Sequence, residues 1–346
     1  MILELLVSAL LAFISVLAGG IFIIPILVRS GFIEQDINKL SRPMLPAGGG
    51  ILLLFGIFIG VMSFVFASDF IIGSQINSYF LMASFVSVAV IAFIGFMDDL
   101  MGSRVRTSKA SLKSISKNYI KFSGGLKQWQ KPLLTLVAAI PIMTINFGSP
   151  VVSLPFIGSV TIPELLYTIV FIPLAIAFAA NSFNMLEGLN GIAVEMSIVA
   201  FSALALFAYH TQQYSAFGIA MIFVTSLIAY LYYGAYPSKI LPGDSLTYLL
   251  GAGFASVIII GNMAPFGMIL IIPWIVEFIL KARIRFHAHS WGLIQKDGTL
   301  KSPHDKKIYS MTHLFLRTGK FKEWQIPLML AGIEAIFAAA AIALMW

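Results

Sequence analysis

The sequence predicts an all-α, polytopic integral membrane protein with about ten transmembrane helices and both termini outside. Of its 346 residues, 59% are hydrophobic and only 11% are charged, a composition that excludes an ordinary soluble domain. A membrane-spanning helix needs roughly 20 apolar residues. Windows of about that length occur at 5–28, 48–67, 78–97, 132–147, 164–181, 192–210, 214–235, 246–262, 264–281 and 326–345.

The whole chain, residues 1–346, is predicted to form a single domain, because no repeat or change in composition divides it. The first window begins near Met1 without a basic segment or a small-residue cleavage site, which predicts a retained helix. The chain has no cysteine, and this excludes disulfides, iron–sulfur clusters and thiolate chemistry.

Basic residues predict the orientation. If the ten windows alternate in direction, one side of the membrane receives five loops, and all 22 Lys and Arg lie in them or at the adjoining helix ends. By the positive-inside rule this side is cytoplasmic. Basic loops facing anionic lipid headgroups account for the net charge of +7, so nucleic-acid binding is not expected. The five loops are 29–47, 98–131, 182–191, 236–245 and 282–325.

The first loop ends in three consecutive glycines, Gly48 to Gly50, before the second window. Polyglycine allows backbone N–H groups to approach a phosphate closely, and it equally allows two membrane helices to pack closely. The sequence leaves both alternatives open.

Two adjacent carboxylates, Asp98 and Asp99, end the third window. They repel each other and meet the negative end of a helix dipole, so a divalent cation or a lysine is expected beside them. The alternative is a solvated pair in a loop. The basic segment that follows suits the anionic leaflet, and its last residue, Lys131, stands directly before Pro132, where a lipid phosphate would be in reach.

Four polar residues recur every three positions after the fifth window: Asn181, Asn184, Glu187 and Asn190. They share one face if the helix continues, and a polar ligand or hydrogen bonding between helices would satisfy them.

The last two loops add an aspartate and two histidines. Asp244 precedes a helix, where a metal ligand and an ordinary N-cap are both consistent with the sequence. His287 and His289 lie in the longest loop and suit phosphate or sugar contacts at least as well as a metal, because no third ligand is evident.

Together these loops resemble those of the polyprenyl-phosphate N-acetylhexosamine-1-phosphate transferase superfamily over nearly the whole chain. The matching segments are Asp98-Asp99, Gly125-Leu126 with Lys131, Asn181 to Gly191, Asp36-Ile37-Asn38-Lys39 with Leu45-Pro46, and Tyr236-Pro237-Ser238 with Gly243-Asp244-Ser245. The fourth and fifth of these are closest to the branch that uses UDP-GlcNAc and dolichyl phosphate. The resemblance departs at Ala47, where eukaryotic members have an acidic residue, and at His287 and His289, where they have arginines.

The resemblance implies a role for each group of residues. Lys131 would position the lipid phosphate, Asp98 would keep it ionised and Asp99 would support Asp98. Mg²⁺, or Mn²⁺ in its place, would be held by Asn184 and Asp244. The residues implied to contact the UDP-sugar are Asn38, Lys39, Asn181, Glu187, Gly188, Asn190, His287 and His289.

The implied function is transfer of GlcNAc-1-phosphate from UDP-GlcNAc to dolichyl phosphate with release of UMP, the first step of lipid-linked oligosaccharide assembly for protein glycosylation. The active site would face the cytoplasm. An archaeal or other prokaryotic cell membrane is expected in preference to the endoplasmic reticulum. The sequence leaves four alternatives open: another UDP-N-acetylhexosamine as donor, undecaprenyl phosphate as acceptor, a covalent aspartyl intermediate, and a homodimer.

A cation-coupled transporter is the alternative from another class. It predicts charged residues near the bilayer midplane within broken helices. The helix centres are instead expected to be almost free of charge, with Glu277 as the nearest exception.

Overall fold

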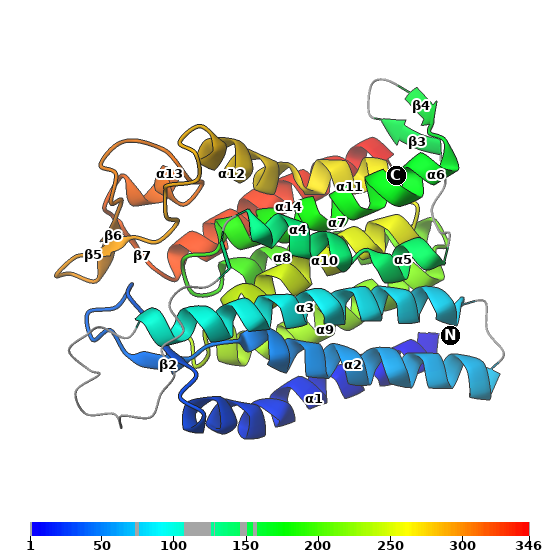
Figure 1. Cartoon of the computed structure of the whole chain (residues 1–346), viewed down its shortest axis with the longest axis horizontal. Coiled ribbons are helices and arrows are strands. Elements are labelled where there is room, and N and C mark those ends of the chain that lie inside the picture. The colour runs from blue at the N-terminus through cyan, green and yellow to red at the C-terminus, as the bar shows by residue number, and fades with distance from the viewer. Residues whose placement is uncertain are drawn as a thin grey trace.

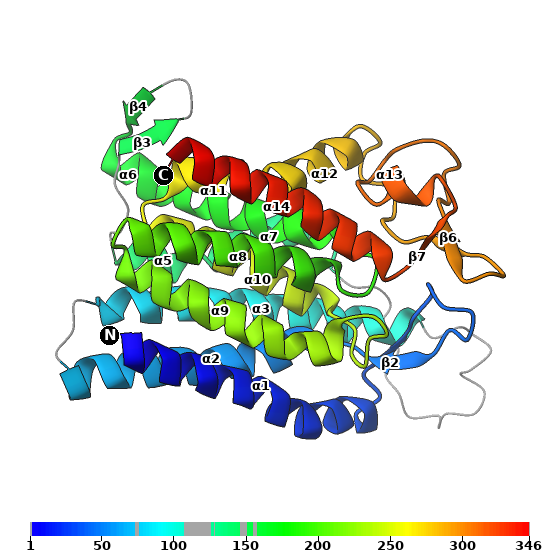
Figure 2. The same ribbon diagram turned by 180° about the vertical axis from the view of Figure 1, so that it is seen from behind.

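The computed structural model describes residues 2–72, 76–106, 126–127, 129–145, 151–154 and 158–345. Long helices run side by side and small sheets lie at the two ends of this bundle (Figures 1 and 2). The long helices are α1 (Ile2–Arg29), α2 (Gly49–Ala67), α3 (Ser78–Arg106), α7 (Ile172–Leu186), α8 (Ile192–His210), α9 (Tyr214–Gly234), α10 (Gly243–Ile260) and α14 (Gln325–Met345).

Shorter elements complete the fold. The short helices are α4 (Gln130–Val137), α5 (Ile140–Thr144), α6 (Glu164–Leu166), α11 (Ala264–Leu270), α12 (Ile272–Ala282) and α13 (His313–Leu316), with π-helical turns at Ser68–Ile72 and Tyr167–Phe171. The strands form three antiparallel sheets: β1 (Ile33–Gln35) with β2 (Met44–Pro46), β3 (Val151–Leu154) with β4 (Gly158–Thr161), and β6 (Thr299–Lys301) between β5 (Leu293–Ile294) and β7 (Phe321–Lys322).

The helical fold class is confirmed, whereas the count of ten spans is not. Among the described residues, eight helices are long and apolar enough to cross a membrane, and a ninth is counted if α11 and α12, bent by 55°, form one span. The remaining window, 132–147, corresponds to α4 and α5, an apolar segment shorter than a span. Prolines explain these interruptions, since Pro141 and Pro273 stand at the starts of α5 and α12 and remove a helical N–H donor.

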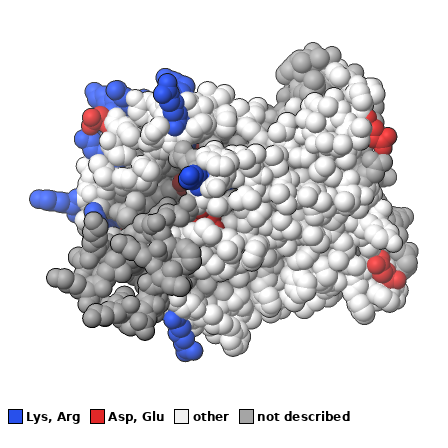
Figure 3. All heavy atoms as spheres, in the orientation of Figure 1, with Lys and Arg blue, Asp and Glu red and all other residues white. Residues whose placement is uncertain are grey.

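The two ends of the bundle differ in charge. The first turn of α1 and the last turn of α14 lie at one end with the β3–β4 hairpin, and the sheets β1–β2 and β5–β7 lie at the other (Figures 1 and 2). On the face drawn in Figure 3, the Lys and Arg side chains gather at the end that carries β5–β7. This agrees with the predicted segregation of basic residues, and the side of the membrane that this end faces stays a prediction.

Helix α10 forms the centre of the bundle. It packs against α2, α3 and α7, and 83% of its span is buried, compared with 22% for α14. Glycines permit the close approach, because a Cβ on Gly50 would lie 2.3 Å from the carbonyl carbon of Ser245, and one on Gly251 would lie 2.5 Å from the carbonyl oxygen of Ala179. The glycines at the start of α2 therefore serve close packing, which positions the first turn of α10 between α2 and α3.

Candidate active site

The first turn of α10 meets the ends of α3 and α4 at an ion-pair cluster. The ammonium of Lys131, in the first turn of α4, lies 2.5 Å from Asp98 Oδ2 and 2.7 Å from Asp244 Oδ2. Asp98 and Asp99 do not end the helix as expected, because α3 continues to Arg106, eight residues beyond Asp98. Asp98 also accepts a 2.6 Å hydrogen bond from the backbone N–H of Leu126. Asp98 is buried, whereas the Lys131 and Asp244 side chains are each 25% exposed. We call Asp98, Lys131, Asn184 and Asp244 the Asp244 cluster.

Asp99 has a different function from its neighbour. Its carboxylate accepts backbone hydrogen bonds from Asp244, at 2.6 Å, and from Ser245, at 3.1 Å. It therefore caps the N-terminus of α10 from α3, where the helix dipole favours an anion. Gly243 begins α10 with φ of +67° and packs against this carboxylate. The cap fixes the position of Asp244, while the N-cap role foreseen for Asp244 falls to Asp99.

Two asparagines of α7 join the same region. Asn184 donates to Asp244 Oδ1 at 2.7 Å and to Thr247 Oγ1 at 2.9 Å. Asn181, one turn earlier, donates to Thr135 Oγ1 of α4 at 3.0 Å and so ties α7 to the helix that carries Lys131. Asn184 is thus part of the Asp244 cluster, and Asn181 supports it.

The charges in this region do not balance. Asp98, Asp99 and Asp244 contribute three carboxylates, and Lys131 is the cation that pairs with them among the described residues. Carboxylate and amide oxygens are hard donors of the kind that Mg²⁺ binds. No group of three or more His, Cys, Asp or Glu side chains that could hold a metal occurs among the described residues. Asp244 and Asn184 carry oxygen donors of this kind, too few by themselves to form a complete magnesium site.

A second buried cluster joins the loop after α1 to the loops after α7 and before α14. Lys39 forms ion pairs with Asp36 and with Glu323, the latter at 3.1 Å. Asn190 donates to Asp36 Oδ2 at 2.9 Å, and its backbone N–H donates to Glu323 Oε1 at 3.0 Å. We call Asp36, Asn38, Lys39, Asn190 and Glu323 the Asp36 cluster.

The predicted contact residues of this cluster are already occupied by protein groups. Asn38 donates to the carbonyl of Gly188 at 2.8 Å and accepts from the N–H of Gly292 at 3.3 Å. A Cβ on Gly188 would lie 2.8 Å from the backbone of Ser290, so this glycine permits two loops to touch. Asn38, Lys39 and Asn190 thus hold loops together in the described structure.

The polar series every three residues does not continue as one helical face. Helix α7 ends at Leu186, and Glu187 adopts an extended conformation with ψ of 139°. Its Oε2 accepts a 3.0 Å hydrogen bond from the N–H of Ala193 at the start of α8. Burial raises the pKa of Glu187 to about 8, which favours a protonated carboxyl group at neutral pH. Only Asn181 and Asn184 remain on the face that meets the Asp244 cluster.

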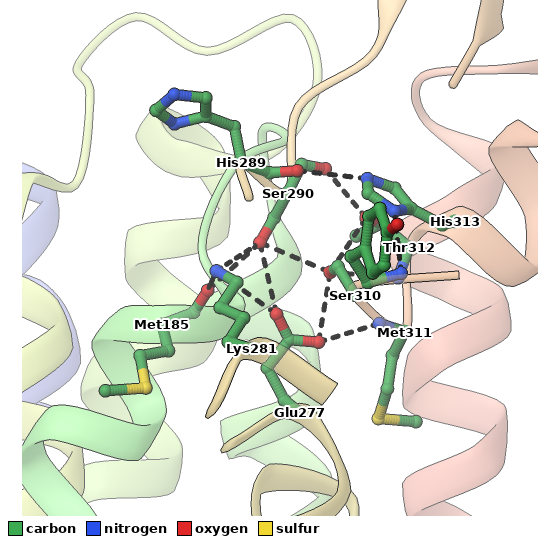
Figure 4. A network of polar contacts seen from close by, with 10 residues as sticks. Met185, Glu277, Lys281, His289, Ser290, Ser310, Met311, Thr312 and His313 are labelled. Atoms are coloured by element: carbon green, nitrogen blue, oxygen red, sulfur yellow. Dashed lines mark hydrogen bonds and ion pairs between the residues drawn. The ribbon is translucent and has the colours of Figure 1, made fainter. Parts of the chain in front are cut away.

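His287 and His289 lie outside both clusters. Both side chains are exposed, and the ring of His289 stacks on Trp291 with centroids 5.4 Å apart. Figure 4 shows the imidazole of His289 pointing away from the buried network beneath it. The two histidines are therefore accessible to a ligand, and no third metal donor accompanies them among the described residues.

Beneath His289 lies a network that was not predicted from the sequence (Figure 4). The Glu277 carboxylate of α12 accepts from Ser310 at 3.0 Å and from the Met311 N–H at 2.7 Å, and it pairs with Lys281 at 3.2 Å. Lys281 also donates to the carbonyl of Met185, next to Asn184. We call the residues Glu277, Lys281, Ser290, Ser310, Thr312 and His313 the Glu277 network.

His313 attaches this network to the histidine loop. Its Nδ1 accepts from the N–H of Tyr309 at 3.2 Å, so its Nε2 carries the hydrogen and donates to the carbonyl of His289 at 3.0 Å. Burial lowers the pKa of His313 to about 4, which keeps the ring neutral. The backbone of His289 is consequently held from below while its side chain is exposed.

The expectation of nearly uncharged helix centres is wrong at Glu334, which is fully buried in the middle of α14 with neither carboxylate oxygen hydrogen-bonded among the described residues. In the sequence, Glu334 could have been recognised as a lone acidic residue within an apolar window.

Gly125 and most of the basic segment, residues 107–125, lie outside the described residues.

The sequence profile of glycosyl transferase family 4 matches residues 80–262 of this chain. A protein of Saccharolobus solfataricus is 34% identical over 99% of the chain and 97% of its own length, and one of Sulfolobus acidocaldarius is 31% identical over 99% and 96%. The names of both assign them, by inference, the activity of a UDP-N-acetylglucosamine–dolichyl-phosphate N-acetylglucosaminephosphotransferase. A phospho-N-acetylmuramoyl-pentapeptide-transferase of Borrelia garinii is 34% identical over 62% of the chain and 61% of its own length.

The Glu277 network generates a test of stability. Lys281→Met leaves the Glu277 carboxylate buried without its cation, so we expect the free energy of unfolding to fall by about 3–5 kcal/mol. The double variant Glu277→Gln/Lys281→Met removes both charges and should lose less. Thermal unfolding followed by tryptophan fluorescence in detergent checks this. A double variant less stable than Lys281→Met would show that the ion pair is not the stabilising element.

Proposed function

We propose a function for this chain, which belongs to glycosyl transferase family 4. It transfers GlcNAc-1-phosphate from UDP-GlcNAc to a polyprenyl phosphate of the dolichyl type and releases UMP. Two archaeal relatives named for this activity are 34% and 31% identical over 99% of the chain, whereas a phospho-N-acetylmuramoyl-pentapeptide-transferase of Listeria monocytogenes, aligned over 94% of it, is 24% identical. This difference favours the dolichyl branch over cell-wall synthesis. It also favours an archaeal cell membrane as the location.

The single observation that carries the proposal is the position of Lys131. Its ammonium lies between a carboxylate of α3 and a carboxylate of α10, and its side chain is partly exposed. A lysine in this position can exchange one carboxylate partner for a phosphate oxygen without becoming unpaired. The site therefore suits the approach of a lipid phosphate to a second, nucleotide-bearing phosphate.

The reaction requires one bond to form and one to break. An oxygen of the lipid phosphate attacks the sugar-proximal phosphorus of UDP-GlcNAc, and the bond from that phosphorus to the bridging oxygen breaks, so that UMP leaves with the electron pair. Lys131 positions the attacking phosphate, and Asp98, 2.5 Å from its ammonium, accepts a proton from that phosphate so that it is fully ionised. Asp99 acts indirectly, because it holds the first turn of α10 and hence Asp244.

A magnesium ion completes the proposal. Asp244 and the amide oxygen of Asn184 would hold it, and bound there it would neutralise charge on the donor diphosphate. The excess of carboxylates over ammonium groups in this region supports the assignment.

The donor sugar is assigned to the loops around the segment after α7. Glu187, whose carboxyl is favoured in its protonated form, can donate a hydrogen bond to a uracil oxygen. Asn38, Lys39, Gly188 and Asn190 shape the adjoining loops through the Asp36 cluster. We assign to the exposed rings of His287 and His289 a contact with the N-acetyl group or the diphosphate through N–H donors.

The function is tested with purified protein in liposomes that contain dolichyl phosphate. Asp98→Asn and Asp244→Asn should each lower incorporation of label from UDP-[³H]GlcNAc into the lipid extract by about a hundredfold or more, because each supplies charge. Asp244→Asn should also weaken Mg²⁺ dependence and donor affinity, whereas Asp98→Asn should mainly lower turnover.

The matched control is Asp297→Asn, which makes the same change in an exposed turn and should keep wild-type activity. Wild-type rates in the Asp98 or Asp244 variant would refute the assignment of that residue. Label that enters the lumen as a soluble compound, without entering lipid, would indicate the transporter alternative.

Lys131→Ala should raise the KM for the lipid phosphate about tenfold or more and change the KM for UDP-GlcNAc much less, because the lipid phosphate is its proposed partner. Lys131→Arg should be intermediate. Lys127→Ala, an exposed lysine four residues earlier, is the control and should retain both constants. Equal effects of Lys131→Ala on the two substrates would contradict a role specific to the lipid phosphate.

The wild-type protein should prefer UDP-GlcNAc to UDP-glucose, and His287→Ala/His289→Ala should reduce this preference, because the acetamide contact is lost. The fold should survive, since the backbone of His289 is held by His313. Rates on both donors provide the measurement. An equal loss on both would assign the histidines to phosphate binding, and a wild-type preference for UDP-glucose would overturn the substrate assignment.

A further inference from the structure

The loop between α12 and α14 encloses a hollow of about 700 Å³ that none of the proposed catalytic residues lines. Four cationic side chains and one acidic side chain border it, giving a net charge of +3. They are Lys301, Lys306, Lys307, Arg317 and Asp305. No ion pair neutralises the four cations among the described residues. Like charges around one space repel each other, and an anion in that space would relieve the repulsion.

Hydrogen bonds fix the turn that presents two of these lysines. The N–H of His304 donates to Ser302 Oγ at 3.1 Å, and the N–H of Lys307 donates to the carbonyl of His304 at 3.1 Å. Asp305, between them, has φ of +53°, in the left-handed region. The lysines at 306 and 307 therefore project from a preformed turn, which lowers the entropy cost of binding a ligand there.

His304 lies in the wall of the same hollow. Its Nε2 atom is inaccessible to solvent, so a ligand in the hollow does not reach this nitrogen. A phosphate in the hollow would pair with the surrounding lysines.

The hollow is built on the Glu277 network. The His304 ring lies 5.3 Å from the ring of Tyr309 and 5.3 Å from that of His313, between centroids. His313 belongs to the buried network shown in Figure 4, whose Thr312 and Ser290 are also hydrogen-bonded, at 2.8 Å. The wall of the hollow at His304 therefore packs against a hydrogen-bonded base, whereas the four cationic side chains around it are exposed.

We infer that this hollow is a binding site for a phosphate-bearing anion, separate from the Asp244 cluster. Lys306, Lys307, Lys301 and Arg317 supply the charge that binds it. A free phosphate compound and the headgroup of an anionic phospholipid share this chemistry, and both occur beside a basic loop at a membrane surface.

Inorganic pyrophosphate is the probe, titrated calorimetrically without divalent metal into the full chain in nanodiscs of neutral lipid. Lys306→Ala/Lys307→Ala should weaken binding at this site about tenfold or more. The matched control is Lys296→Ala/Lys320→Ala, which removes two exposed lysines of the same loop and should bind as the wild type does.

A further variant separates the hollow from the catalytic cluster. Lys131→Ala, which removes the cation of the Asp244 cluster, should retain the binding that Lys306→Ala/Lys307→Ala removes. The proposal is overturned if the two double variants bind pyrophosphate equally, or if Lys131→Ala alone abolishes all binding. The readout is binding, so its result is independent of transfer activity.

Nanodiscs that contain anionic phospholipid distinguish the two ligand sources. If the wild type loses pyrophosphate binding in these discs, and retains it in neutral discs, the headgroup competes for the site. Equal binding in both kinds of disc assigns the site to a free phosphate compound.

Discussion

The active-site region depends on one ammonium group that is shared between two carboxylates. Lys131 lies between Asp98 of α3 and Asp244 of α10, so it fixes the separation of two helices as well as the charge between them. The arrangement requires that α10 approach α3 closely, which glycines permit, and that the first turn of α10 be held, which the Asp99 carboxylate achieves. Packing of small residues in the bundle therefore determines the electrostatics at its end.

The segment after α7 connects this cluster to the loops. Asn184 binds Asp244, the neighbouring carbonyl of Met185 accepts from Lys281, and Gly188 and Asn190 bind the loop after α1. The segment 184–190 thus contacts the helix ends, the Glu277 network and the Asp36 cluster.

Much of the site followed from the sequence, because polar residues at the ends of apolar windows are costly unless they meet. Asp98, Lys131, Asn184 and Asp244 were foreseen as functional, and the structure brings them together. The Asp36 cluster depends on the contact of Lys39 with Glu323, 284 residues apart, and the Glu277 network on that of Lys281 with Met185, 96 residues apart; no local period encodes these contacts. The end of α7 at Leu186 and the bend between α11 and α12 are likewise set by tertiary packing and proline.

The most direct test follows the sugar-proximal phosphorus. UDP-GlcNAc carrying ³²P at that position is incubated with the purified protein, dolichyl phosphate and Mg²⁺, and the lipid and nucleotide products are separated. Phosphoglycosyl transfer at Lys131 predicts that the label enters the lipid and that unlabelled UMP appears in equal amount. Release of labelled UDP would instead show transfer of the sugar without its phosphate and would contradict the account.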